Sequence, residues 1–143
     1  MNEVTPFHLA IPVENLDLCR NFYGKTLGCQ EGRSSSQWVD FNFFGHQLVI
    51  HQKDKNEGVQ EKVLNAVDGH QVPVPHFGVA LKWEQWQALK EKLNKQQIQF
   101  IIEPYIRFKG DPGEQATMFF LDPEGNALES KAFKQIENLF ATS

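Results

Sequence analysis

The chain has 143 residues, with 14 basic and 18 acidic side chains and a formal net charge of −4. This length suits one domain with a sizeable core, and the acidic balance excludes a dedicated nucleic-acid surface, because phosphate binding requires clustered positive charge. No apolar run approaches the roughly 18 residues of a membrane span, and the first residues lack the basic and apolar pattern of a secretory signal. We therefore expect a cytoplasmic protein with neither a nucleic-acid nor a membrane partner.

The first half of the chain predicts short strands around one helix. In residues 6–13, PFHLAIPV, the apolar side chains alternate with a second face that carries His8 and small residues. Residues 15–27 show the apolar spacing of one helical face, and Gly28 ends that helix. Further strands are expected over residues 30–33, 37–44 and 47–52. Gly45-His46 forms the tight turn between the last two strands.

The same order returns after a polar segment, residues 53–74, which is expected to be a linker with one helical turn around Val63–Ala66. The second half predicts a strand at 75–82, a helix at 83–96 with Trp86, Leu89 and Leu93 inward, a strand at 98–103, a long loop at 104–114, strands at 115–121 and 127–132, and a closing helix at 133–140. The two halves are therefore copies of one strand-helix-strand-strand-strand module, offset by about 68 residues at the first strand.

A duplicated module of this kind predicts an α+β fold. Each four-stranded sheet alone would leave one face uncovered, so two tandem βαβββ modules are expected to form a curved, cup-shaped mixed sheet with helices outside and a cavity within. The expected organisation is one domain over residues 1–143. Its parts are module one (4–52), the linker (53–74), module two (75–132) and a C-terminal helix (133–141).

Two histidines occupy matching positions in the repeat. His8 is followed two residues later by Ala10, and His76 is followed two residues later by Gly78, so each histidine stands above a small residue on its strand. Such a face suits the floor of an open cavity better than a packed core. On the last strand of the second module, Glu129 follows an apolar Leu128, and a carboxylate in such surroundings is costly unless it is paired or binds a cation.

Several motifs resemble those of the vicinal oxygen chelate superfamily, which contains glyoxalase I, extradiol dioxygenases, fosfomycin-resistance proteins and bleomycin-binding proteins. The similar motifs are an opening F-H-x-A, a helix ending F-Y-x-x-x-L-G, a second-module P-H-x-G, and a closing D-P-x-G-N-x-x-E at Asp122, Pro123, Gly125, Asn126 and Glu129. The resemblance covers nearly the whole chain. It is greatest to a small group of extradiol-dioxygenase-like proteins.

This resemblance implies a metal site formed by His8, His76 and Glu129. Two histidines and one carboxylate suit Fe(II) with open positions for substrate and oxygen, and Zn, Ni or Mn are the alternative divalent ions. In glyoxalase I a fourth ligand comes from the last strand of the first module, where this chain has His51. In extradiol enzymes a histidine near that strand acts as a second-sphere acid–base. His51 is therefore either a fourth ligand or a catalytic acid–base, and its even spacing from Gly45 places it on the face equivalent to that of Glu129.

Further candidate residues lie in the segment YIRFKG at 105–110. Tyr105 and Arg107 are expected at the cavity rim, where they would donate hydrogen bonds to an anionic oxygen of a bound substrate. His46 and His70 are expected to be exposed, with His70 a candidate for a lid over the cup. Cys19 and Cys29 do not make a disulfide framework and are expected to be reduced packing residues.

The function expected from these features is that of a metal-dependent dioxygenase. It would bind a small substrate through two adjacent oxygens at one divalent ion. Two alternatives stay open: a glyoxalase-type isomerase or lyase with four protein ligands, and a non-catalytic small-molecule-binding protein of the resistance type. The resemblance to this superfamily also implies a homodimer.

Overall fold

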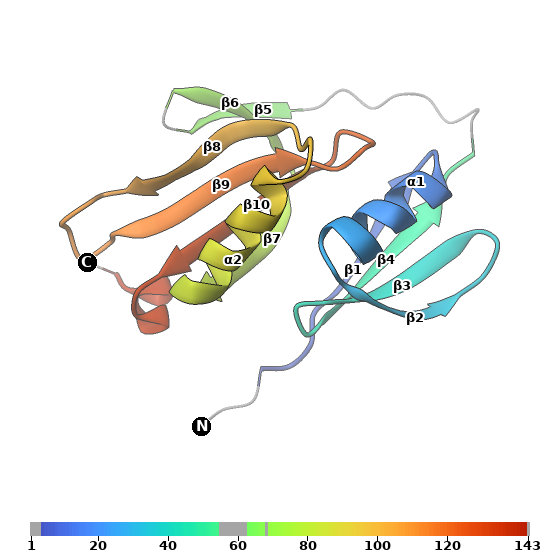
Figure 1. Ribbon diagram of the computed structural model, residues 1–143, viewed down its shortest axis with the longest axis horizontal. Coiled ribbons are helices and arrows are strands. Elements are labelled where there is room, and N and C mark those ends of the chain that lie inside the picture. Colours follow the sequence, from blue (N-terminus) through green and yellow to red (C-terminus); the bar gives the residue numbers. More distant parts are fainter. Residues whose placement is uncertain (1–3, 55–62, 68, 143) are drawn as a thin grey trace. The chain divides into compact units, whose positions relative to one another are not determined.

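The computed structural model describes residues 4–54, 63–67 and 69–142. The chain divides into two compact units, Met1–Gln60 and Glu61–Ser143. In the described residues, each unit holds a four-stranded mixed sheet with an α-helix packed on one face (Figure 1). The α+β class and the duplicated βαβββ module are therefore confirmed. The closing of both sheets into one cup stays a prediction.

The first unit follows the predicted order closely. Its elements are β1 (His8–Val13), α1 (Leu16–Asn21), the π-helical turn η1 (Phe22–Thr26), β2 (Gln30–Ser34), β3 (Trp38–Phe43) and β4 (His46–Gln52). The sheet order is β1-β4-β3-β2, with β1 parallel to β4 and the other pairs antiparallel. Asn15 caps α1, because its side-chain oxygen accepts a hydrogen bond from the backbone N–H of Leu18 at 3.0 Å.

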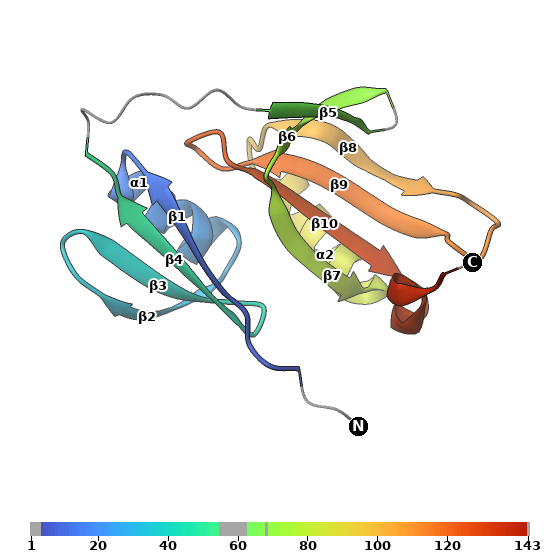
Figure 2. The ribbon, with the colours of Figure 1, turned by 180° about the vertical axis from the view of Figure 1, so that it is seen from behind.

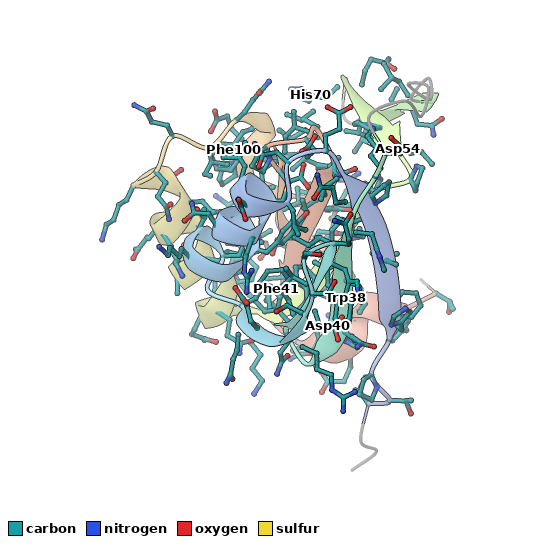
Figure 3. The ribbon with its side chains drawn as sticks, turned by 90° about the vertical axis from the view of Figure 1, so that its right-hand side faces the viewer. Trp38, Asp40, Phe41, Asp54, His70 and Phe100 are labelled. Atoms are coloured by element: carbon teal, nitrogen blue, oxygen red, sulfur yellow. The ribbon has the colours of Figure 1, made fainter. Side chains whose placement is uncertain are left out.

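Alternation along β3 separates the core of the first unit from its helix-free face. Val39, Phe41 and Phe43 are buried on the helix side, where the rings of Tyr23 and Phe41 lie 5.9 Å apart between centroids. Trp38 and Asp40 point to the opposite side (Figure 3), and by the same alternation Asn42 does too. We call this opposite side, in either unit, the helix-free face.

The second unit repeats the module and adds a hairpin before it. Its elements are β5 (Val63–Val67), β6 (His70–Val74), β7 (Phe77–Lys82), α2 (Trp83–Asn94), β8 (Phe100–Arg107), β9 (Gln115–Leu121), β10 (Ala127–Phe133) and the 3-10 helix η2 (Ile136–Phe140). The sheet order, β7-β10-β9-β8, is that of the first unit. As predicted, Trp86, Leu89 and Leu93 of α2 are buried, and the Trp86 indole N–H donates to the backbone oxygen of Ser130 at 3.0 Å.

The predicted linker is wrong where the structure describes it. Instead of a helical turn around Val63–Ala66, residues 63–67 and 70–74 pair as the antiparallel hairpin β5–β6, which lies along β8 (Figure 2). Fully buried Val72 packs there against Ile102 and Phe119. The remaining linker positions, 55–62 and 68, lie outside the described residues.

Two other boundaries differ from expectation. β8 continues to Arg107, so the long loop predicted from Pro104 is shorter, and Tyr105 and Arg107 are strand residues paired with Thr117 and Gln115. The predicted closing helix is shortened to η2, because Phe133 belongs to β10. Phe140, which was expected on the apolar side of that helix, is 84% exposed. No helix among the described residues is long and apolar enough to cross a membrane.

Candidate metal centre

His76 and Glu129 meet on the helix-free face of the second unit. In the parallel pairing of β7 with β10, Glu129 lies opposite Gly78 and Lys131 lies opposite Ala80, so these side chains share the face on which His76 stands. A shallow pocket of about 230 Å³ opens over this face. It is lined by His76, Phe77, Gly78, Val79, Ala80, Glu129, Lys131 and Leu139.

The His76 ring is held in one orientation by its surroundings. Its Nδ1 lies 2.8 Å from the backbone oxygen of Pro73 on β6, and because a carbonyl only accepts, Nδ1 carries the proton. The ring of Phe119 packs edge to face against it, with 5.0 Å between centroids. The remaining nitrogen, Nε2, faces Glu129 Oε1 at 3.6 Å. Metal-binding histidines are commonly oriented in this way, with the second nitrogen donating to a carbonyl.

The two carboxylate oxygens of Glu129 have different partners. Oε2 accepts a hydrogen bond from the Thr117 hydroxyl at 3.0 Å and lies 3.6 Å from the Lys131 ammonium, whereas Oε1 is turned to His76. The glutamate side chain is only 12% exposed.

The distance between Nε2 and Oε1 indicates what belongs between them. At 3.6 Å they are too far apart for a direct hydrogen bond, and a lone pair on Nε2 facing a carboxylate oxygen is unfavourable without a cation. Two ligands at about 2.0–2.2 Å from one ion stand roughly 3.0–3.6 Å apart. The pair therefore fits two neighbouring positions around a divalent metal ion.

Gly78 lets the backbone of β10 approach β7 at this point. A Cβ atom built on Gly78 would lie 1.5 Å from the carbonyl oxygen of Glu129, a distance no side chain tolerates. The glycine of the P-H-x-G motif thus sets the depth at which Glu129 is held. At the matching place in the first unit, Ala10 lies opposite Val49.

The closing motif D-P-x-G-N-x-x-E forms the turn that brings Glu129 onto β10. Asp122 is buried at 4% exposure, and its Oδ1 accepts hydrogen bonds from the backbone N–H groups of Glu124 and Asn126, both at 2.9 Å. Its Oδ2 accepts a third from the side chain of Asn126, and Gly125 adopts the left-handed conformation, with φ 83°. This turn fixes the β9–β10 register, in which Glu129 lies opposite Phe119.

Replacing Asp122 by alanine is expected to lower the free energy of unfolding by about 2–4 kcal/mol, because two backbone N–H groups lose their acceptor inside the turn. Denaturant unfolding measures the effect. Asp111→Ala, in the exposed loop before β9, is the matched control and should change stability little. Equal losses in the two variants would contradict the role assigned to the Asp122 carboxylate.

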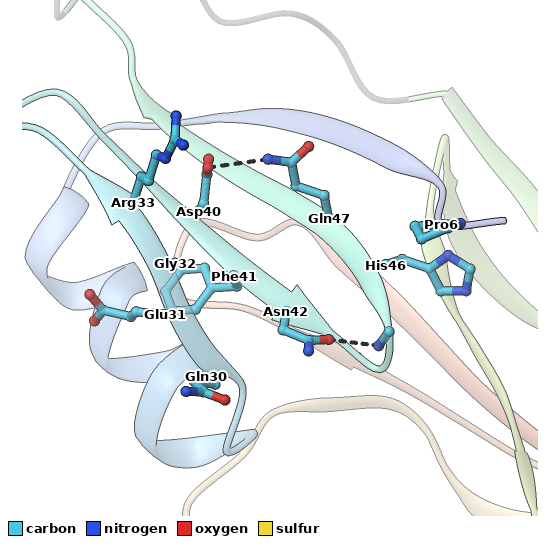
Figure 4. Close-up of a pocket in the computed structure, with 11 residues that line it drawn as sticks. Pro6, Gln30, Glu31, Gly32, Arg33, Asp40, Phe41, Asn42, His46 and Gln47 are labelled. Carbon is cyan, nitrogen blue, oxygen red and sulfur yellow. Dashed lines mark hydrogen bonds between the residues drawn. The ribbon is translucent and has the colours of Figure 1, made fainter.

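On the first unit, His8 lies at one end of a row of polar side chains that crosses the sheet. The register pairs Gln30 with Asn42, Asn42 with Gln47 and Gln47 with His8. A pocket of about 540 Å³ beside this row is lined by Pro6, Gln30, Glu31, Gly32, Arg33, Asp40, Phe41, Asn42, Gly45, His46 and Gln47 (Figure 4). Glu31 lines this pocket. Hydrogen bonds from Arg20 hold the pKa of the Glu31 carboxyl below its ordinary value.

His51 lies on the same face of the sheet as His8, at a different position along the strands. It lies opposite Pro12, whereas His8 lies opposite Gln47, which separates the two along the strands by four residues or about 13 Å. By the repeat, the position equivalent to Glu129 is the residue opposite Ala10, which is Val49. His51 lies on the predicted face, but the register displaces it by one residue pair from the glutamate's position, and the valine at that position offers no ligand atom.

Tyr105 and Arg107 lie on the edge strand β8, not in a loop. Tyr105 is paired with Thr117, which is paired in turn with Lys131, so the tyrosine belongs to the face that carries Glu129. It is half-buried and packs against the cluster of Val72, Ile102 and Phe119. Arg107 lies over the ring of Phe108, with Cζ 4.8 Å from the centroid. Their proposed catalytic roles stay predictions.

The structure also shows the surroundings of the other two candidate histidines, His46 and His70, and of the two cysteines. His46 is half-buried rather than exposed, and its Nδ1 accepts a hydrogen bond from the backbone N–H of Phe7 at 2.8 Å. His70, at the start of β6, is exposed as expected. Cys19 and Cys29 are both buried, as expected of packing residues.

The three predicted ligands are thus distributed over both units. His76 and Glu129 lie together in the second, and His8 belongs to the first. In the part of the chain that the structure describes, no three histidine, cysteine, aspartate or glutamate side chains gather as a metal-binding group. Sequence reasoning missed Gln47 and Thr117, which contact two of the three predicted ligands. Their roles depend on strand register, which the sequence motifs did not specify.

Two βαβββ modules, with His8 beginning the first strand of one and His76 directly preceding the first strand of the other, define a paired-module α+β protein with a candidate metal centre. A family model described as Glyoxalase/Bleomycin resistance protein/Dioxygenase superfamily matches residues 5–130. The chain belongs to this superfamily, as its motifs predicted. A search of curated proteins finds no significant match.

Solved structures agree with this assignment. A glyoxalase/bleomycin resistance protein/dioxygenase from Alicyclobacillus acidocaldarius is 29% identical, with a TM-score of 0.74 over 95% of this chain and 96% of that one. The fosfomycin resistance protein FosX from Listeria monocytogenes is 17% identical, with a TM-score of 0.67 over 96% and 98%. An integron cassette protein from the mobile metagenome of the Halifax Harbour sewage outfall is 22% identical, with a TM-score of 0.63 over 90% and 98%. The last two likenesses show the fold alone.

Proposed function

We propose that the protein is a metal-dependent dioxygenase that binds a small substrate through two adjacent oxygens at one divalent ion held by His8, His76 and Glu129. The observation that carries this proposal is the pair His76 Nε2 and Glu129 Oε1, 3.6 Å apart on the floor of a pocket, each with its other polar atom already engaged. Membership of a superfamily whose description includes dioxygenases supports it.

The residues present favour three protein ligands over four. Val49 occupies the position that repeats Glu129, and His51 lies one residue pair beyond it. Two histidines and one carboxylate leave coordination positions open, and when bound there, Fe(II) supplies both Lewis acidity for substrate oxygens and redox chemistry with dioxygen. A glyoxalase-type site with a fourth protein ligand lacks its donor in the first module. We therefore assign His51 the acid–base role, not ligation.

Other side chains of the second unit have definable roles in this proposal. Thr117 and Lys131 hold the Oε2 side of Glu129, so that Oε1 keeps one direction. The edge-on ring of Phe119 restricts rotation of His76 and excludes water from one side of it. Tyr105 and Arg107, on β8, are the candidates for donating hydrogen bonds to an anionic substrate oxygen. A small-molecule substrate and a homodimer belong to the same proposal.

Anaerobic reconstitution tests the function directly. The metal-free protein is loaded with Fe(II), its iron content is measured, and oxygen uptake is followed with a panel of substituted catechols. Parallel samples with Zn²⁺ or Ni²⁺ are assayed with a glutathione hemithioacetal. We expect one iron per chain and uptake with at least one catechol. Isomerisation of the hemithioacetal without oxygen uptake would contradict dioxygenase chemistry. A protein that binds none of these ions would contradict the metal-dependent proposal and favour the non-catalytic binding alternative.

A further inference from the structure

His8 has its own hydrogen-bond partner on the sheet. Its Nδ1 lies 2.7 Å from Oε1 of Gln47, the residue directly opposite it on β4. The amide nitrogen of Gln47 donates in turn to Oδ2 of Asp40 on β3 at 3.1 Å, as Figure 4 shows. Three neighbouring strands thus contribute one side chain each to a chain of hydrogen bonds, which we call the Asp40–Gln47–His8 relay.

Asp40 determines which atom donates and which accepts in each hydrogen bond of this relay. An ionised aspartate only accepts hydrogen bonds, so Asp40 requires the NH₂ group of Gln47 to face it. The amide oxygen of Gln47 is then left facing His8, and because an amide oxygen only accepts, the neutral imidazole has to carry its proton on Nδ1. Nε2 becomes the nitrogen with the free lone pair.

We propose that Gln47, held by Asp40, is the positioning residue of His8: it keeps the imidazole proton on Nδ1 and leaves Nε2 available as a ligand. The inference rests on the metal-binding role of His8 in the proposed function, and it adds two residues to that site. His76 presents the same tautomer, with the backbone oxygen of Pro73 in place of the glutamine. The two modules thus favour the same histidine tautomer with different acceptors.

Three variants test the relay. Gln47→Leu removes the acceptor at nearly constant volume. The double variant Asp40→Asn with Gln47→Glu exchanges amide and carboxylate, so the net charge and an acceptor for His8 Nδ1 are both kept. Gln30→Leu, in the same row and lining the same pocket, is the matched control. Gln30 and Gln47 are both exposed, so neither leucine removes a buried contact.

Two measurements are made on each variant. The first is the ¹⁵N chemical shift of the His8 ring nitrogens in metal-free protein, at a pH where the imidazole is neutral, with the signals assigned by His8→Ala. The second is the dissociation constant for Zn²⁺, obtained by competition with a chromogenic chelator. Wild type, Gln30→Leu and the exchange variant should show protonated Nδ1. Gln47→Leu should shift toward protonated Nε2 and bind Zn²⁺ about 10–100-fold more weakly, the usual effect of losing a partner behind a ligand.

The outcomes separate the relay from the proposed function. A Gln47→Leu protein with the wild-type tautomer, or an exchange variant that fails to restore it, would overturn the relay even if the wild type binds metal. If the tautomer responds as expected but the wild type binds neither Zn²⁺ nor Fe(II), the orienting role of Gln47 stands and the metal-dependent function falls.

Discussion

Exchanging Glu129 for glutamine is expected to abolish stoichiometric binding of a divalent ion. The amide oxygen can still accept from Thr117, whose hydroxyl donates to the glutamate at 3.0 Å, so the local fold should be kept. What disappears is the negative charge that compensates a cation next to His76. Since partners behind a ligand alone change metal affinity about 10–100-fold, loss of the ligand itself should exceed about 100-fold. Metal content after reconstitution and calorimetric titration measure the loss.

The control for this prediction is Glu103→Gln. Glu103 is an exposed residue on β8, so the same change in charge and shape occurs away from the pocket. It should retain wild-type metal content, and both variants should unfold at similar denaturant concentrations. A Glu129→Gln protein that still binds one divalent ion per chain would remove Glu129 from the ligand set.

The second large effect is expected on stability, from Gly78→Ala. A Cβ at this position would overlap the carbonyl oxygen of Glu129 at 1.5 Å and its carbonyl carbon at 2.5 Å. The obstacle is backbone, so no rotamer change relieves the overlap and β7 has to move away from β10. Overpacking costs roughly 1–3 kcal/mol when side chains can adjust, so we expect a loss at or above the top of that range. Denaturant unfolding of the purified variant provides the measurement.

Gly32→Ala on β2 is the matched control. Its added methyl group would lie 3.5 Å from Cβ of Asp40, which is ordinary van der Waals contact, and Gly32 also lies within a strand. This variant should change stability by less than about 1 kcal/mol. Equal stability of the two alanine variants would show that β10 yields easily beside Gly78, and the depth of Glu129 would then need another cause.

Much of the fold was predictable because periodicity and turn residues acted together. His8 and His76 were expected above small residues, and the pairing of Glu129 with Gly78 places that glutamate on the face of His76. A tight turn is predicted at Gly45-His46, and the structure has it one residue earlier, at Phe44 and Gly45, with φ 52° and 91°. His46 already belongs to β4.

The errors came from signals that competed with periodicity. In residues 63–74 the spacing of Val63 and Ala66 suggested a helical turn, whereas the Asp68-Gly69 dipeptide between two β-branched segments is a typical hairpin signal. Gly69 has φ 82° at the turn of the observed hairpin. Pro104 does not end a strand, although its position had predicted that it would. It lies instead on the edge strand β8, at a register shift between Ile102 and Tyr105, where a missing N–H is tolerated.

Register was the information that the sequence lacked for the site. The spacing of His51 from Gly45 gave the correct face, but only the pairing of β1 with β4 shows that Gln47 lies beside His8 and that Val49 takes the place of Glu129. An equivalent place for His51 and Glu129 requires the two hairpins to differ by one residue pair. They do not, because Val49 and Glu129 each lie four residues after the turn glycine, opposite Ala10 and Gly78.

The different acceptors behind the two histidines have a consequence for how the protein tolerates mutation. The orientation of His76 depends on a main-chain oxygen, which every amino acid at position 73 would supply. The orientation of His8 depends on the side chain of Gln47, which a single codon change can remove. During evolutionary drift, the amino-terminal copy of the duplication should therefore lose the acceptor behind its histidine before the carboxy-terminal copy does.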